Sequence, residues 1–333
     1  MTITLLGSAA AVGVYAVAQH LGIDPVPPGT PFAHQRAVSV FANPNELGSF
    51  CACVLPVLLA MFLWNEWGAE PRARHRLPVY VASAAVYAGL LLSASRGAWA
   101  AAAVGILVVA GGALRQAGRG DLVLRLRPAA VMVVLLGAVT AALGQRPLVR
   151  GEGGGVYLAD RAFSVRHFLR PVSPGLPGAA AVVQDESINH RYFIWHVTWQ
   201  MIRSRPVVGL GYGCYGRHFA AFRGASEGTT RFATLNRVAR SETTPYAHNE
   251  LLHVWAETGL LGVAAMVALV SVTLHGVWRR AWSGGPATPW LWGALGLLVA
   301  LLVDSLVSFP LRLPLGCLVF WLALGAAAGL AQR

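Results

Sequence analysis

The sequence contains no lysine, few charged residues of either sign and only four cysteines. Charged residues occupy 12% of its 333 positions, whereas soluble domains carry about 25%. The cysteines show neither the spacing of a zinc site nor that of a disulfide framework. These shortages argue against a soluble enzyme and against a small disulfide-stabilised domain. We expect neither a metal nor a cofactor.

Apolar residues are abundant instead, at 56% of the chain, with a mean hydropathy of +0.56. They form continuous runs almost free of charge, and a helix needs about 20 such residues to cross a bilayer. The first run has no basic segment before it, so we interpret it as a span and not as a signal peptide. We therefore predict an all-α integral membrane protein, a single multi-pass domain over 1–333 with about eight transmembrane helices, at 3–21, 46–67, 78–94, 97–114, 128–144, 249–276, 288–309 and 313–331.

The placement of arginine predicts the orientation. Arginines cluster in the segments 72–76, 115–127 and 279–280, and Arg333 ends the chain. Alternate spans put all of these on one side, which the positive-inside rule assigns to the cytoplasm. Both termini are then cytoplasmic. The segment 22–45 and one long loop, 146–247, lie on the outer face, which is the periplasm in a bacterial inner membrane.

The long loop is basic, with 13 arginines against six acidic residues. This surplus predicts an anionic ligand outside the membrane, and contact with lipid headgroups is the alternative explanation. Nucleic acid is not expected, because the charge is spread over several loops without a DNA-reading motif. Within the loop, residues 187–204 read as an amphipathic helix with Tyr192, Trp195, Trp199 and Ile202 at helical spacing.

Three arginines from distant segments share the predicted outer face. Arg36 precedes Asn43-Pro44-Asn45, a turn whose Asn45 can cap the following helix. Arg96 lies in a very short turn between two spans, where it is either a fixed phosphate clamp or a snorkelling interfacial residue. Arg191 begins the amphipathic helix, where arginines on a polar face are common.

A histidine and two acids complete the candidates. His248 lies where the long loop re-enters the membrane, and a helix N-terminus lowers the pKa of a histidine, so we expect it to be neutral and able to accept a proton. His253, one turn further on, is expected to pack. Glu257 and Asp304 are ionisable groups within spans, with structural or proton-related roles as the two possibilities.

At these residues the sequence resembles the O-antigen ligase and Wzy-type polysaccharide polymerase superfamily. The resemblance covers roughly residues 30–330 and rests on four short stretches in a fixed order around the long loop: FANPNELGSF (41–50), SASRGAW (93–99), NHRYFIWHVTWQMIRSRPVVGLGYGCYGRHF (189–219) and AHNELLHVWAETGLLG (247–262). Family members often have further spans at the N-terminus, where this chain looks short.

The resemblance implies a metal-independent glycosyltransferase of the GT-C type in the bacterial inner membrane. Its donor would be a glycan on undecaprenyl diphosphate, and its acceptor lipid A-core of lipopolysaccharide, another glycan or a protein. Arg96, Arg191 and His248 match the family's catalytic residues. Arg36, Asn45, Asn249 and Arg217 are candidates for substrate binding. The sequence does not separate a ligase from a polymerase or a protein O-oligosaccharyltransferase, and a transporter or flippase of lipid-linked anionic glycans is the alternative outside this class.

Overall fold

The computed structural model describes residues 2–24, 36–64, 73–116, 119–149, 155–163, 186–226 and 244–332. The chain divides into two compact units. Unit 1 comprises Met1–Ala162, Thr273–Asp304 and Arg312–Arg333, and unit 2 comprises Phe163–Val272 and Ser305–Leu311.

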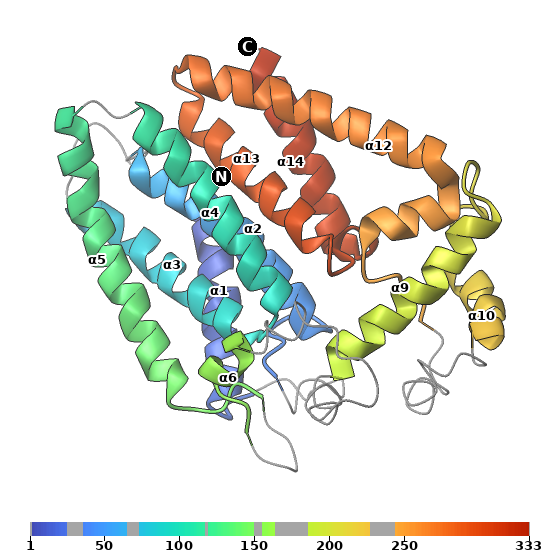
Figure 1. Ribbon diagram of the computed structural model, residues 1–333. Helices are drawn as coiled ribbons and strands as arrows, with labels where there is room; N and C mark the ends of the chain where they lie inside the picture. The colour runs from blue at the N-terminus through green and yellow to red at the C-terminus, as the bar shows by residue number, and fades with distance from the viewer. Residues whose placement is uncertain are drawn as a thin grey trace. The chain divides into compact units, whose positions relative to one another are not determined.

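Helices make up unit 1 where the structure describes it (Figure 1). They are α1 (Thr2–His20), α2 (Pro44–Leu63), α3 (Ala73–Leu92), α4 (Arg96–Gln116), α5 (Arg119–Gly144), α6 (Leu158–Phe163), the C-terminal part of α12 (Glu250–Ser283), α13 (Thr288–Asp304) and α14 (Pro314–Gln332). Each of the eight segments predicted to span the membrane lies mostly within a helix, which confirms an all-α protein over the described residues.

Small residues set the packing of unit 1. α4 packs on α13 and α2, and α1 packs on α3. A Cβ atom at Gly105 of α4 would lie 2.7 Å from the carbonyl oxygen of Gly296 on α13, and one at Gly13 of α1 would lie 2.2 Å from the backbone of Ala85 on α3. Such close approach of helix backbones is the usual packing mode in a bilayer, where water does not drive apolar surfaces together.

Several helices have the length and composition of membrane spans. Among the described residues, α2, α4 and α12 are long and apolar enough to cross a bilayer, and α3, α5, α13 and α14 contain shorter apolar stretches. These helices indicate a membrane protein. The number of spans and their orientation remain predictions. The arginine side chains at 72–76 and 119–127, and Arg333, which set that orientation, lie outside the described residues.

Unit 2 contains α9 (Glu186–Ser204), α10 (Tyr215–Ser226) and the first part of α12. The amphipathic helix predicted at 187–204 is therefore confirmed as α9. Its buried face consists of Phe193, Ile194, Val197, Met201 and Ile202, and it packs on α10 and on the start of α12. Of the aromatic stripe predicted on this helix, Trp199 remains 46% exposed.

The predicted span 249–276 is not one uninterrupted helix. α12 is interrupted at Gly259, whose φ of 69° and ψ of −172° are not helical. The loop 206–211 replaces the missing helical hydrogen bonds: Leu210 N–H donates to Ala256 O, Gly211 N–H to Glu257 O and Leu260 N–H to Pro206 O, each at 2.9 Å. Residues 260–283 then continue as a helix to Ser283.

The predicted end of the seventh span, at residue 309, is also wrong. α13 ends at Asp304, followed by turns and the short helix η2 (Pro310–Arg312). The chain leaves the helix because two carbonyls bind the start of α12: Ser305 O accepts from Glu250 N–H at 2.8 Å, and Leu306 O accepts from Asn249 Nδ2 at 2.8 Å. Parts of the predicted long loop, 150–154, 164–185 and 227–243, lie outside the described residues.

Candidate functional site

In unit 1, Arg96 follows a tight turn between α3 and α4. Residues 93–95 connect the two helices, and Arg96 is the first residue of α4 and only 8% exposed. Ala94 has a φ of 49°, a left-handed conformation that is uncommon for a residue with a side chain. The Nε1 of Trp99 donates to Leu90 O at 2.8 Å, which ties the start of α4 to the end of α3. Arg96 thus begins α4 directly after a constrained turn.

Two further arginines bind the carbonyls of this turn. Arg36 donates from Nε to Ser93 O at 2.8 Å, and its Nη2 contacts the same carbonyl. Arg161 of α6 donates from Nε to Ala94 O at 3.0 Å. Arg161 comes from the long loop and was not among the residues that the sequence indicated, since nothing in the segment LADRAF marks it.

The stretch 41–50 supports the turn from the other side. A Cβ atom at Gly48 would lie 2.9 Å from Ser93 Oγ and 2.9 Å from Ala98 Cβ, so the absence of a side chain lets α2 approach. The predicted cap, Asn45, is wrong: Asn43 is the N-cap of α2, and its side chain accepts from Asn45 N–H at 2.8 Å. The Oδ1 of Asn45 instead accepts from Arg36 Nη2 at 3.4 Å.

Asp304, the last residue of α13, is 1% exposed and accepts a hydrogen bond from Ser49 Oγ of α2. The contact joins the end of α13 to the stretch 41–50. The sequence left a structural and a proton-related role open for Asp304, and both stay predictions.

In unit 2, His248 lies two residues before α12 with a φ of 52°. The rings of Phe309 and His248 form a T-shaped pair at a centroid distance of 4.6 Å, and the ring of His190 lies 6.3 Å from that of His248. The Nδ1 of His248 is buried and has no hydrogen-bond partner among the described residues. Such an atom is available to a ligand that displaces or enters beside these rings.

Electrostatics keep His248 neutral. Its pKa is lowered to about 3, first by burial and then by the positive charge of Arg191 and by His190. The predicted lowering of the His248 pKa is therefore confirmed, although burial rather than a helix N-terminus is the main cause. The effect of Arg191 also indicates that its charge lies near His248.

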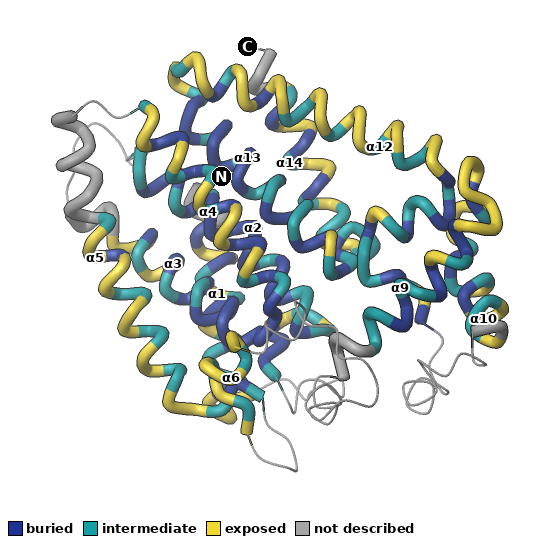
Figure 2. Tube along the Cα trace, viewed as in Figure 1, coloured by how far each residue is buried: buried dark blue, intermediate teal, exposed yellow. Residues whose placement is uncertain are grey.

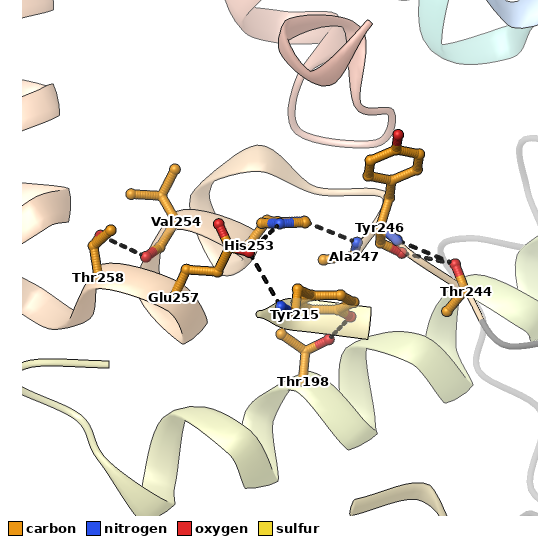
Figure 3. A network of polar contacts seen from close by, with 9 residues as sticks. All are labelled: Thr198, Tyr215, Thr244, Tyr246, Ala247, His253, Val254, Glu257 and Thr258. Carbon is orange, nitrogen blue, oxygen red and sulfur yellow. Dashed lines mark hydrogen bonds and ion pairs between the residues drawn. The ribbon is translucent and has the colours of Figure 1, made fainter. Parts of the chain in front are cut away.

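The backbone before His248 is held on both sides. Trp195 Nε1 donates to Ala247 O at 3.0 Å. Ala247 N–H donates to Nδ1 of His253 at 3.3 Å (Figure 3). Because Nδ1 of His253 accepts this bond, its Nε2 carries the proton and contacts Glu257 Oε1 at 3.3 Å. The expectation that His253 packs is confirmed, and Glu257 lies in the same buried network.

Tyr215 completes this network (Figure 3). Its ring stacks on His253 at 4.4 Å, and its N–H donates to Glu257 Oε1 at 3.2 Å. Thr198 uses its proton on Ile194 O, so the Tyr215 hydroxyl, 2.6 Å away, must donate to Thr198 Oγ1. Burial raises the pKa of Tyr215, which keeps that proton in place. These groups form a scaffold for the peptide that carries His248.

Two other predicted binding residues have different surroundings. Asn249 caps α12: its Oδ1 accepts from Leu252 N–H at 2.9 Å, while its Nδ2 donates to Leu306 O. Arg217 lies on α10 and is exposed. Among the described residues, no group of three or more His, Cys, Asp or Glu side chains is arranged to hold a metal.

The comparison with protein families finds a match to the family model described as O-antigen ligase, over residues 80–267. This range covers more than half of the 333 residues. It includes Arg96, Arg191 and His248, whereas Arg36 and Asp304 lie outside it. The comparison with curated proteins finds no match.

Proposed function

The chain belongs to the O-antigen ligase family, and we propose that it transfers a glycan from undecaprenyl diphosphate to an acceptor hydroxyl at the periplasmic face of the bacterial inner membrane. Membership of the family implies glycan transfer of the ligase or polymerase type. The donor, the acceptor, the membrane face and the GT-C class are parts of the proposal.

The observation that carries the proposal is the neutral, half-buried His248, whose buried Nδ1 has no partner among the described residues, beside the charge of Arg191. A histidine that accepts a proton from a hydroxyl must be unprotonated, and a cation nearby keeps it so. The strained φ of His248 supports a functional role, because strain of about 1–3 kcal/mol persists where the surrounding structure holds it in place.

In the proposed reaction, the acceptor oxygen attacks the anomeric carbon while the bond from that carbon to the phosphate oxygen breaks. The electron pair of this bond passes to the diphosphate, and His248 accepts the hydroxyl proton. A diphosphate bound near Arg191 would offset the positive charge that lowers the pKa of His248. His248 would then become more basic when the donor is bound.

The leaving group gains negative charge as the bond breaks, and preorganised cations stabilise such charge. We assign this role to Arg96 and Arg191, with Arg36 contributing to donor binding. Arg96 is suited to it because its turn is held by hydrogen bonds from Arg36 and Arg161. A side chain that starts from a backbone held in this way loses less freedom when its guanidinium binds phosphate.

Transfer by the purified full chain in proteoliposomes tests the proposal, with a defined oligosaccharide on undecaprenyl diphosphate as donor. His248→Ala, Arg96→Ala and Arg191→Ala should each lower transfer by at least roughly 100-fold. Arg203→Ala, an exposed arginine on the same helix as Arg191, is the matched control and should retain activity. Normal transfer by His248→Ala would contradict the mechanism.

A panel of acceptors in the same assay distinguishes a ligase, a polymerase and a protein O-oligosaccharyltransferase. Lipid A-core, a second lipid-linked repeat unit and a protein are the three acceptors to compare. Movement of the intact donor between leaflets without any transfer product would support the transporter alternative and overturn the proposed enzyme.

A further inference from the structure

A cavity of about 740 Å³ lies in unit 1, away from the turn at 93–95, between α4, the C-terminal part of α12 and α13. Its α4 wall contains Leu107, Gly111 and Arg115, which are four residues apart and therefore share one face of the helix. The opposite wall contains His275, Trp278 and Trp282 at similar spacing. The cavity is thus a groove that runs along helices.

One end of the groove carries a positive charge, that of Arg115. The guanidinium carbon of Arg115 lies 5.0 Å from the centre of the Trp282 ring, a distance at which a cation is attracted by an indole face. A guanidinium over an indole can still donate from its edge to phosphate oxygens. None of the residues that line the groove is acidic, so the charge of this end favours an anion.

The length of α4 places this end at the level of lipid headgroups. Arg115 follows Arg96 by 19 residues, about 28 Å of helix, which is close to the thickness of a bilayer's hydrocarbon core. Leu107 lies two turns back toward the middle of the helix. The groove therefore runs from a polar level, where Trp282 also lies, into the apolar part of the same leaflet.

α12 leaves this space open to lipid. Only 6% of its most apolar stretch is buried, and Figure 2 shows exposed residues along its length. The groove's mouth is nevertheless framed by fixed contacts: Gln116 Nε2 donates to Ala281 O at 2.7 Å, and Trp64 Nε1 donates to Gln116 Oε1 at 3.2 Å. These bonds hold the ends of α4 and α12 while the groove beside them stays unfilled by protein.

We propose that this groove binds an anionic phospholipid from the leaflet opposite the Arg96 turn. The phosphate lies at Arg115, and an acyl chain lies along Leu107 and Gly111 against Trp278. The proposal does not depend on the chemistry of glycan transfer, so it can fail or hold independently of the proposed function.

Native mass spectrometry of the full chain in detergent tests the proposal. Dioleoyl phosphatidylglycerol, dioleoyl phosphatidylcholine and inorganic phosphate are titrated separately. The first phosphatidylglycerol should bind roughly fivefold more tightly than the first phosphatidylcholine, because one arginine contributes about that factor near a membrane surface. Equal binding of the two lipids would indicate only annular lipid and overturn the proposal. Inorganic phosphate that binds as tightly as phosphatidylglycerol would also overturn it.

Matched glycine variants test the location. A Cβ at Gly111 or at Gly137 meets no atom within 4 Å, so both positions accept a leucine, but only Gly111 lines the groove. Gly111→Leu should weaken the binding of the first phosphatidylglycerol molecule at least roughly tenfold. Gly137→Leu should bind this lipid as tightly as the wild type does. Arg115→Gln should remove the preference for phosphatidylglycerol and keep phosphatidylcholine binding unchanged. Equal binding by the two leucine variants, both monodisperse with wild-type thermal midpoints, would overturn the assignment.

Discussion

His248 shows how neighbouring residues prepare one side chain. The peptide before it is hydrogen-bonded through both its carbonyl and its N–H, to Trp195 and His253. Its own φ is positive, and its half-buried ring lies against Phe309. A neutral imidazole whose buried Nδ1 has no hydrogen-bond partner among the described residues is costly to maintain, which is consistent with a role in binding or catalysis.

The pKa of His248 predicts a pH dependence of stability. In the unfolded chain this histidine takes up a proton near its ordinary pKa of 6.5, whereas in the folded protein it does so only near 3. The unfolded state therefore binds more protons between these values, and stability falls as the pH falls from 6.5 toward 3. In His248→Gln this contribution is absent. Thermal midpoints measured by tryptophan fluorescence between pH 7.5 and 4 should decline less in the variant, and identical slopes would contradict the burial of a neutral histidine.

Arg161 provides a second prediction at this scale. The Nε of Arg161 donates to the carbonyl of Ala94, two residues before Arg96. We expect Arg161→Gln to lower transfer roughly tenfold, because Arg96 is then held less firmly in position. This effect is in line with the loss of a charged hydrogen bond, about 1.5–3 kcal/mol. Arg146→Gln, at an exposed arginine of the same loop, is the control. The donor KM should rise in Arg161→Gln while the thermal midpoint changes little; an unchanged KM would refute the positioning role.

The sequence could not indicate Arg161, because Arg161 binds a turn 67 residues earlier and no local pattern shows such a contact. The cap of α2 could have been read locally, because Asn43 precedes a proline at the first helical position, where proline is favoured. Arg96, Arg191 and His248 were selected from the sequence because each stands in a short stretch that resembles the family, and their roles stay predictions.

At the scale of elements, the interruption of α12 depends on two facing glycines. Gly209 and Gly259 have φ values of 70° and 69°. A Cβ at Gly259 would lie 2.1 Å from Val207 O, and one at Gly209 would lie 2.4 Å from the carbonyl carbon of Glu257. The loop 206–211 therefore fits against α12 only where both residues lack side chains.

This arrangement predicts that Gly259→Ala destabilises unit 2 by more than the roughly 1 kcal/mol that a positive φ costs an alanine. Gly213→Ala is the matched control, because Gly213 has a φ of 74° but open space around it. Thermal midpoints of the two variants in detergent should differ by several degrees, with Gly259→Ala the lower. Equal midpoints would show that backbone strain, and not the close contact with Val207, sets the cost.

The helices themselves were predictable, but some of their ends were not. Apolar runs identified α1–α5, α13 and α14 because a span needs a long charge-free segment. The end of α13 at Asp304 and the interruption at Gly259 depend instead on carbonyls that bind backbone from distant segments, Ser305 O to Glu250 and Pro206 O to Leu260. Hydropathy contains no information about such bonds.

At the scale of the whole molecule, the predicted orientation states on which side of the membrane each end of α12 lies, and this can be tested. The helix from 260 to 283 has 24 residues, about 36 Å, which exceeds the roughly 30 Å of a hydrocarbon core. The loop bound to its start should then lie on the periplasmic side, and its end on the cytoplasmic side with Arg279 and Arg280. Hydrogen bonds from 206–211 to 256–261 connect that loop to the start of the helix.

Labelling of single cysteines in cells tests this orientation. Cys214 and Cys317 are replaced by alanine, while Cys51 and Cys53 are buried and should not react. Tyr212→Cys, at a residue 80% exposed, should react with a membrane-impermeant maleimide in intact spheroplasts. Ser283→Cys, at the other end of α12, should react only after the membrane is opened, because the reagent cannot reach the cytoplasm. The opposite pattern would reverse the orientation and place the proposed chemistry of His248 on the cytoplasmic face, which a periplasmic glycan transferase does not permit.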